Sequence, residues 1–441
     1  MTAVIVDDDP TGAQTLRDVA LIFGVDPALL NRHLDAGELA VCVLTNSRAL
    51  SADAARSANQ RVAAALRERA GAMPLLVSRG DSTLRGHVAV EVGALRAALP
   101  DGAGVRRVFV PAFIEAGRTT RAGRHFVDIA GQPVPVGETP FATDARFGFS
   151  SSDLPDFLAE VGAVADAGEV DIVPLELVAE GTDAVASAIA NGGGSWTVVD
   201  ATTVAHIDAI AAALQRLHAA GVPMVVRCAP SLVRALARRD SLPALTDDEL
   251  RAAFPARRGH GLVVVGSHVP QTTRQLASLT GVTGLARFEA GIDALTSEDP
   301  GDRAALVEAV VAALQTNDVV LETPRAEVRD TSAGGDLARR LSDSLCEIVA
   351  AVHARAELGW VIAKGGITSH ETAAQGLGIR SASVVGQLFD GKVSIIRPIE
   401  ALRRTIDLPY VIFPGNVGGD DDLRIAVERL RRLTFTDEET S

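Results

Sequence analysis

The sequence is poor in cysteine, and this excludes a disulfide framework. Its three cysteines, Cys42, Cys228 and Cys346, lie far apart in apolar surroundings, and no two form a C-x-x-C pair. Such thiols are typical of the reduced core of a cytoplasmic protein. The chain also lacks a long hydrophobic run and a basic stretch behind Met1, so we expect neither a membrane helix nor a signal peptide. The expected location is the cytoplasm.

Positive charge is scarce as well. The formal net charge is -14, and Lys364 and Lys392 are the only lysines. A general nucleic-acid partner needs a basic face that neutralises its phosphate backbone, so nucleic-acid binding is not expected. Any phosphate that this chain binds has to be met locally, by a few side chains and backbone N–H groups.

Several catalytic signatures are missing. No G-x-x-x-x-G-K-[ST] segment, no G-x-G-x-x-G after the first apolar run and no G-x-S-x-G segment occur. These absences argue against a P-loop enzyme, a standard dinucleotide site and an acyl-transfer hydrolase with a nucleophile elbow. The nine histidines show no metal-ligand spacing, so no metal-binding residues are predicted.

The chain does contain an alternation of short apolar runs and helical stretches. Unbroken β-branched and aliphatic runs are typical of strands that are buried on both faces of a parallel sheet. The predicted strands of the N-terminal half are Ala3–Val6, Ala40–Leu44, Leu75–Val77, Val108–Val110, Trp196–Val199 and Met224–Val226. Between them, one helix is predicted from the N-cap candidate Ser51 to Ala70, and another between His87 and Pro100.

The length of the chain favours two domains. With 441 residues it exceeds one ordinary core, and a polar, proline-interrupted stretch at residues 238–258 suggests a boundary. We expect one domain at residues 1–235, a connecting segment at 236–258 and a second domain at 259–441. The second contains the run Leu262–Val265, an amphipathic helical pattern from Leu337 to Val352 and the strand Trp360–Ala363. Both domains are predicted to be α/β with mainly parallel sheets.

Two glycine-rich turns stand out in the second domain. Lys364-Gly365-Gly366-Ile367-Thr368 and Pro414-Gly415-Asn416-Val417-Gly418-Gly419 each follow an apolar run. Turns of this kind offer bare backbone N–H groups to an anion, most often phosphate. A single glycine turn after a strand usually only ends that strand, but two such turns in the same half of the chain indicate a nucleotide site.

Polar residues follow the first two predicted strands, where ligands bind in open α/β sheets. Asp7, Asp8 and Asp9 crowd one turn, and adjacent carboxylates need a cation, a metal or hydrogen-bond donors between them. Solvated turn residues are the alternative interpretation. Arg48 follows the second strand and suits a carboxylate substrate, although an isolated loop arginine is usually only solvated.

The richest cluster is the segment 78–87, which packs charge, hydroxyls and glycines into ten residues. From its placement Asp81 is the expected catalytic base, with Asp8 or Asp9 as the alternative. Ser82 and Thr83 could hydrogen-bond a polyol, and Arg79 or Arg85 could hold a carboxylate. The competing interpretation is that Asp81 or Ser82 only caps the following helix.

Taken in order, these motifs resemble those of the four-carbon acid sugar kinase family. The similar segments are Asp8-Asp9-Pro10-Thr11-Gly12-Ala13, Asp81-Ser82-Thr83-Leu84-Arg85-Gly86, Gly266-Ser267, Lys364-Gly365-Gly366-Ile367-Thr368 and Gly415-Asn416-Val417-Gly418. A further family segment, Pro111-Ala112-Phe113 with Gly117-Arg118-Thr119-Thr120, lies between them. Each motif alone is weak, but five in the right order at compatible spacings form a specific signal.

The resemblance implies a two-domain kinase with an interdomain cleft. Members use ATP and Mg²⁺ to phosphorylate threonate, erythronate or 3-oxo-tetronate at the terminal hydroxyl. The implied acid-sugar site comprises Asp8, Asp9, Arg48, Asp81, Ser82, Thr83 and Arg85. The predicted ATP site comprises Ser267, Lys364, Gly365, Gly366, Ile367, Thr368, Gly415, Asn416 and Gly418.

Two departures from the family pattern bear on the substrate. Ser78-Arg79-Gly80 stands where many relatives carry lysines, and Ile367 stands where many have an acidic residue. Two other functions stay open: an NAD-dependent hydroxy-acid dehydrogenase, and a non-catalytic sugar-acid-binding protein. The missing early glycine fingerprint disfavours the first, and Asp81 with both glycine turns disfavours the second. The expected partners are a small sugar acid and ATP, without a membrane, and a homodimer is left open.

Overall fold

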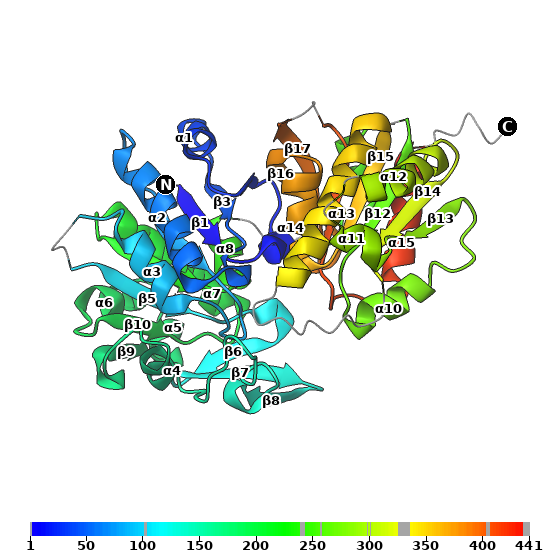
Figure 1. The fold of residues 1–441 in the computed structure, drawn as a ribbon. Coiled ribbons are helices and arrows are strands. Elements are labelled where there is room, and N and C mark those ends of the chain that lie inside the picture. The colour runs from blue at the N-terminus through cyan, green and yellow to red at the C-terminus, as the bar shows by residue number, and fades with distance from the viewer. Residues whose placement is uncertain are drawn as a thin grey trace. The chain divides into compact units, whose positions relative to one another are not determined.

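The structure, a computed structural model, describes residues 2–100, 104–238, 243–255, 258–297, 299, 301–324, 336–402 and 406–434. The chain divides into two compact units, Met1–Leu242 and Pro243–Ser441. Each unit alternates strands with helices (Figure 1), which confirms the predicted α/β class. Within the described ranges, no helix is long and apolar enough to cross a membrane.

The first unit is built on a parallel sheet with the strand order β2-β3-β1-β4-β11-β5-β10-β9. Its strands are β1 (Ala3–Asp7), β2 (Ala20–Phe23), β3 (Ala40–Leu44), β4 (Leu75–Arg79), β5 (Arg106–Val110), β9 (Val170–Val173), β10 (Trp196–Val199) and β11 (Met224–Cys228). The six predicted strands are confirmed, while β2 and β9 were not predicted. Because neighbouring strands pair in parallel, the carboxyl ends of β3, β1, β4 and β11 lie at one edge of the sheet.

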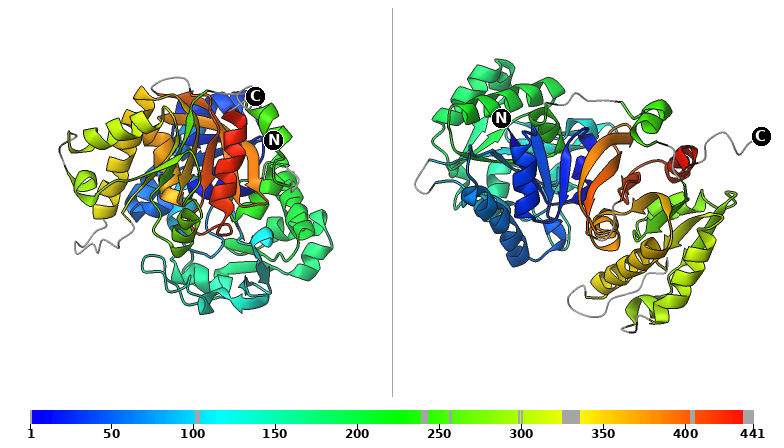
Figure 2. Two further views of the ribbon diagram at one scale, coloured as in Figure 1. Left: turned by 90° about the vertical axis from the view of Figure 1, so that its right-hand side faces the viewer. Right: turned by 90° about the horizontal axis from the view of Figure 1, so that it is seen from above.

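Helices cover both faces of this sheet (Figure 2), so its central strands are fully buried. They are α1 (Pro27–Asp35), α2 (Ala52–Glu68), α3 (Val88–Arg96), α4 (Leu154–Glu160), α5 (Leu175–Ala179), α6 (Thr182–Asn191), α7 (Val204–Ala219) and α8 (Pro230–Leu236). Ser51 caps α2 as predicted, since its side chain accepts a hydrogen bond from the Ala54 N–H. The cap of α3 is His87, not Asp81 or Ser82, so the capping interpretation of those two residues is wrong.

A small antiparallel sheet, which was not predicted, belongs to the same unit. It consists of β6 (Arg118–Arg121), β7 (Arg124–Ile129) and β8 (Gln132–Pro135). A bridge between Thr120 and Ala201 ties it to the chain after β10. The family-like segment Gly117–Thr120 therefore opens this sheet.

The second unit has the strand order β13-β14-β12-β15-β18-β17-β16. Its strands are β12 (His260–Val265), β13 (Leu285–Glu289), β14 (Asp318–Glu322), β15 (Leu358–Lys364), β16 (Ile379–Phe389), β17 (Val393–Ala401) and β18 (Tyr410–Phe413). The neighbours β13, β14, β12, β15 and β18 pair in parallel. Strand β17 pairs antiparallel with both β18 and β16. The predicted strands are present, and the hairpin of β16 and β17 was not predicted.

The helices of the second unit include the predicted amphipathic one. They are α9 (Asp247–Ala253), α10 (Pro270–Ala277), α11 (Ile292–Thr296), α12 (Gly301–Ala313), α13 (Asp336–Arg355), α14 (Gly366–Glu371) and α15 (Asp422–Thr434). Helix α9 lies inside the segment 236–258 and begins with a Thr246–Glu249 capping box. Its Leu250, and Phe254 directly after the helix, are buried in the core of this unit. That part of the segment is therefore folded with the second unit.

Candidate functional site

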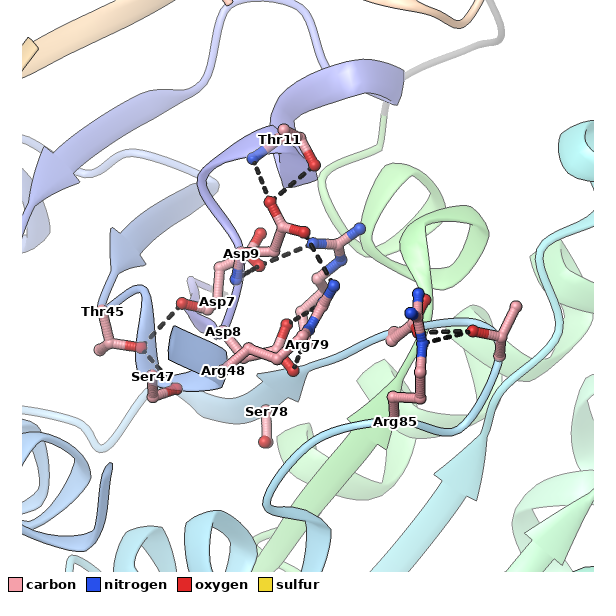
Figure 3. A network of polar contacts seen from close by, with 12 residues as sticks. Asp7, Asp8, Asp9, Thr11, Thr45, Ser47, Arg48, Ser78, Arg79 and Arg85 are labelled. Atoms are coloured by element: carbon pink, nitrogen blue, oxygen red, sulfur yellow. Dashed lines mark hydrogen bonds and ion pairs between the residues drawn. The ribbon is translucent and has the colours of Figure 1, made fainter. Parts of the chain in front are cut away.

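The carboxyl ends of β1, β3 and β4 bring together acidic and basic side chains (Figure 3). Arg48 lies between two carboxylates: it forms an ion pair with Asp8, and its Nη1 donates to Asp9 Oδ2 at 2.8 Å. Arg79 Nη1 is 2.8 Å from Asp7 Oδ1. The expected crowding of carboxylates is thus real, and two guanidinium groups balance it. Arg48, predicted to hold a substrate carboxylate, already holds two aspartates.

The carboxylates of this turn differ in their titration. Burial raises the pKa of Asp7 to about 7, although Arg79 opposes this shift. Burial also acts on Asp9, but Arg48, Arg79 and hydrogen bonds from Thr11 outweigh it and hold its pKa below the usual range. Asp9 is therefore ionised at neutral pH, while Asp7 is close to its titration midpoint.

A buried ion pair contacts the aspartate turn that follows β1. Arg227, on β11, pairs with Glu91, on α3, and each side chain is 2% exposed. Arg227 Nη1 also donates to Ser78 Oγ at 2.7 Å, and its Nη2 lies 3.4 Å from Asp8 Oδ2. Ser47 donates to the second oxygen of Glu91. Sequence reasoning missed both charged residues, although each interrupts an otherwise apolar run.

Two glycines let the backbone pass close to these charges. A Cβ at Gly12 would stand 1.7 Å from Asp7 Oδ2, and one at Gly80 would stand 1.9 Å from Arg227 Nη2. Real Cβ atoms do not approach other atoms so closely. Any side chain at either position would therefore displace a charged partner from the cluster.

The loop after β4 holds Asp81 as a carboxylate. Arg85 Nε donates to Asp81 Oδ2 at 2.7 Å, and the Thr83 hydroxyl donates to the same oxygen. Burial alone would raise the pKa of Asp81, but Arg48, Arg85 and the hydrogen bond from Thr83 together hold it below its usual range. Leu84 follows with a φ of +70° and is buried, a conformation that few non-glycine residues adopt outside functional or tightly constrained loops.

A buried histidine from the small sheet holds this loop in place. His125 Nε2 is 2.8 Å from the Ser82 carbonyl oxygen, and its Nδ1 is 3.0 Å from Thr120 Oγ1. Because a carbonyl only accepts, Nε2 carries the proton and Nδ1 accepts from the threonine hydroxyl. Burial lowers the pKa of His125 to about 4, so the ring is neutral at physiological pH. This residue was not predicted, because nothing local in its sequence links it to Ser82.

The predicted acid-sugar residues are therefore gathered at neighbouring strand ends of one sheet. Asp8 is 1% exposed, and its oxygens face Arg48 and Arg227. Asp81 is more accessible, with 13% of its side chain exposed, and Arg48 lies close enough to act on its pKa. Arg85 also reaches Asp144, at 3.5 Å.

In the second unit the turns after β12, β15 and β18 interlock. A Cβ at Gly266 would stand 2.5 Å from Thr368 Oγ1, and one at Gly415 would stand 2.5 Å from Ser267 Oγ. Gly365 has a φ of +123° and also faces Ser267 and Thr368. The structure thus brings together residues from three separate segments of the predicted ATP site, and their close approach requires glycine.

The first glycine turn is the start of a helix rather than an open loop. Gly365 is the N-cap of α14, and the first helical hydrogen bond runs from the Ser369 N–H to the Gly365 carbonyl at 2.9 Å. The N–H groups of residues 366–368 precede that bond and have no acceptor within the helix. Ile367 is 50% exposed beside them, an unusual position for a large apolar side chain.

Side chains of α10 hold the second glycine turn through hydrogen bonds to its carbonyl groups. Thr272 Oγ1 is 3.0 Å from the Gly415 carbonyl oxygen, and Gln275 Nε2 donates to the carbonyls of Val417 and Gly419. Asn416 is exposed at its tip. A Cβ at Gly418 would stand 2.7 Å from Asp422 Oδ2, so this glycine packs against the start of α15. The carbonyls of this turn are thus held by side chains that the sequence did not single out.

Lys364 is fully buried and faces the protein itself. Its Nζ donates to the Pro414 carbonyl at 2.6 Å and lies 4.0 Å from the centroid of the Phe413 ring. Burial lowers the pKa of Lys364 to about 7. This lysine therefore links the two glycine turns in place of presenting its charge to solvent.

Comparison with known proteins gives both units a family. Residues 3–236 match the family model of a sugar-binding N-terminal domain, and residues 262–423 match that of a nucleotide-binding C-terminal domain. A D-threonate kinase of Bordetella bronchiseptica is 30% identical, over 98% of this chain and 98% of that protein. A D-threonate kinase of Salmonella typhimurium is 28% identical, over 96% of this chain and 97% of that protein.

Solved structures show the same fold. A putative tRNA synthase of Salmonella typhimurium LT2 aligns with a TM-score of 0.72 at 19% identity, over 99% of this chain and 100% of that one. The Haemophilus influenzae protein HI1011 aligns with a TM-score of 0.67 at 19% identity, over 98% of this chain and 100% of that one. At such identity the likeness concerns the fold alone. With the matched domains and the full-length relatives, the chain belongs to the four-carbon acid sugar kinase family.

Proposed function

We propose that this protein is an ATP-dependent kinase that phosphorylates a four-carbon acid sugar of the threonate, erythronate or 3-oxo-tetronate type at its terminal hydroxyl. The observation that carries the proposal is the ionised Asp81, held by Arg85 and Thr83 in a strand-end cluster rich in arginine. The full-length similarity to D-threonate kinases supports the same reaction.

Asp81 is the proposed catalytic base. Phosphoryl transfer needs an oriented hydroxyl and charge stabilisation more than a strong base, because the transition state is loose. A carboxylate that stays ionised and partly accessible meets that need. Asp8 is less suited to accept a proton, since Arg48 and Arg227 face its oxygens. We assign Asp8 the task of positioning Arg48.

The nucleotide side of the reaction is proposed to lie at the glycine turns of the second unit. The N–H groups of residues 366–368 would meet phosphate oxygens, with Ser267 and the turn at Gly415 beside them. No three acidic, histidine or cysteine side chains are grouped to hold a metal ion in the part of the chain that the structure describes. Mg²⁺ is therefore proposed to arrive with ATP, where it neutralises phosphate charge.

An assay of ADP release with a panel of four-carbon acids tests this proposal. ADP formation that depends on one of these acids is the expected result. The rival dehydrogenase would instead change the nicotinamide absorbance when NAD is added, and a binding protein would show neither signal.

The cysteines are free and buried, which supports a reducing compartment such as the cytoplasm. A homodimer stays a prediction, to be tested by the mass in solution.

A further inference from the structure

Carboxylates neutralise four arginines of the acidic cluster in the first unit, and a fifth arginine lies within electrostatic range of the same cluster. The paired ones are Arg48, Arg79, Arg85 and Arg227, which contact Asp8 and Asp9, Asp7, Asp81, and Glu91, respectively. The fifth is Arg118. Among the described residues no carboxylate lies within ion-pair distance of it, and its Nη1 donates only to the Ala116 carbonyl, at 2.7 Å.

Part of the Arg118 guanidinium is buried without an acceptor. Its Nε is shielded from solvent and has no hydrogen-bond partner. Leaving a buried donor unpaired is unfavourable, and more so when the group is charged. Burial lowers the pKa of Arg118. The charge of Arg85 lowers this pKa further, whereas the charge of Asp81 raises it, so Asp81 and Arg85 both lie within electrostatic range of the Arg118 guanidinium.

The backbone of Arg118 is fixed next to the Asp81 loop. Arg118 begins β6, and two hydrogen bonds with Phe113 anchor it, at 2.9 and 3.0 Å. The neighbouring strand β7 carries His125, which binds the carbonyl of Ser82. The small sheet therefore positions Arg118 and the Asp81 loop together.

We propose that Arg118 binds the carboxylate of the acid substrate and so sets the preference for an acid over a neutral polyol. This inference rests on the proposed function. A substrate carboxylate at any of the four paired arginines would have to compete with an aspartate or a glutamate. At Arg118 it meets an unneutralised guanidinium, whose planar fork matches a carboxylate. In this arrangement Arg118 holds the carboxylate at one end of the acid, and the terminal hydroxyl at the other end of the four-carbon chain is the group that reaches Asp81.

The experiment compares the wild-type protein with Arg118→Met, Arg118→Lys and the control Arg121→Met, an exposed arginine of the same strand. Loss of a charged hydrogen-bonded pair is expected to raise the KM for threonate about 10- to 100-fold in Arg118→Met. The KM for ATP stays unchanged. Arg118→Lys is expected to recover part of the loss, because it keeps the charge without the fork. Arg121→Met is expected to match the wild type.

The choice of substrate gives a second readout. Threitol, the polyol that lacks the carboxylate, is expected to be used equally poorly by wild type and Arg118→Met, so the preference for acid falls in the variant. An unchanged KM for threonate in both Arg118 variants would overturn the inference. So would a KM that rises equally for threonate and for ATP.

Direct titration of threonate, without ATP, separates this inference from the proposed function. Wild-type protein that binds the acid but transfers no phosphate, with binding lost in Arg118→Met, would retain the inference and reject the kinase. Wild-type protein that phosphorylates threonate while Arg118→Met binds it equally well would do the reverse. Wild-type protein that binds no four-carbon acid would reject both.

Discussion

Lys364 donates a hydrogen bond from its Nζ to the carbonyl of Pro414 at 2.6 Å, and this contact ties the two glycine turns together. The two residues lie at the carboxyl ends of β15 and β18, which are neighbours in the second sheet. The ammonium is fully buried against the Phe413 ring. Lys364 therefore acts as an internal brace of the proposed nucleotide site.

Replacing Lys364 should weaken the binding of ATP and leave the binding of the acid substrate unchanged. Lys364→Met removes the only side-chain hydrogen bond described for the Pro414 carbonyl, so the turn at Gly415 keeps its contacts with α10 but loses its link to the first glycine turn. A lost charged hydrogen bond corresponds to about 1.5–3 kcal/mol, and we expect the KM for ATP to rise by at least tenfold. Steady-state kinetics checks this, with Lys392→Met, at the exposed second lysine, as the control. Equal ATP kinetics in the two variants would contradict the prediction.

The Arg227–Glu91 pair should be important for stability. Glu91→Gln removes the closer of the two carboxylates that face the buried Arg227 guanidinium and leaves only Asp8, at 3.4 Å, which costs up to about 3–5 kcal/mol. Urea denaturation is expected to show this as a large fall in the midpoint. Glu308→Gln breaks an exposed pair with Arg355 and should change the midpoint little. A similar midpoint for the two variants would argue against the role given to the buried pair.

The neutral His125 makes stability depend on pH. Its folded pKa of about 4 lies below the reference value of 6.5, so the unfolded chain binds the extra proton first on acidification. The stability from this residue is present above pH 6.5 and is lost as the pH falls toward 4, by up to about 3 kcal/mol.

Urea midpoints between pH 7 and pH 4.5 measure this slope. His125→Gln cannot gain the proton, so its stability should vary less with pH over the same range. An identical slope in the variant and the wild type would show that His125 is not the group responsible.

Two glycines of the first unit should respond in opposite ways to the same substitution. Gly80→Ala drives a methyl group into Arg227 and should weaken both stability and acid binding. Gly93→Ala, in the interior of α3, meets no atom within 4 Å and should stabilise the protein by about 0.5–1 kcal/mol. Thermal denaturation compares the pair, and a Gly80→Ala protein as stable as Gly93→Ala would contradict the packing described for Arg227.

The sequence predicted those parts of the fold that local patterns determine. The apolar runs that became β1, β3 and β4 are buried on both faces, and Ser51 caps its helix as predicted. The glycine turns were found because glycine at a strand end is a local signal. Strands of the small sheet were missed because β6 is short and polar, and β8 is short and contains two prolines, which are rare in strands.

The contacts that define the site could not be predicted, because they join distant segments. Arg227 and Glu91 are 136 positions apart, and Lys364 reaches a carbonyl 50 positions away. The sequence placed Arg48 correctly after its strand but could not show that two aspartates neutralise it. Because Arg48 is already paired, we assign the substrate carboxylate to Arg118, which no described carboxylate neutralises.

The transfer of phosphate from ATP to threonate, followed by ³¹P NMR with wild-type protein and Asp81→Asn, tests the central claim most directly. The wild type is expected to convert threonate to a monophosphate as ADP forms in equal amount. Asp81→Asn keeps the shape of the side chain but cannot accept the proton, and its turnover should fall by about two orders of magnitude or more. No phosphorylated acid from the wild type would contradict the kinase, and equal turnover in the variant would remove Asp81 from its proposed role.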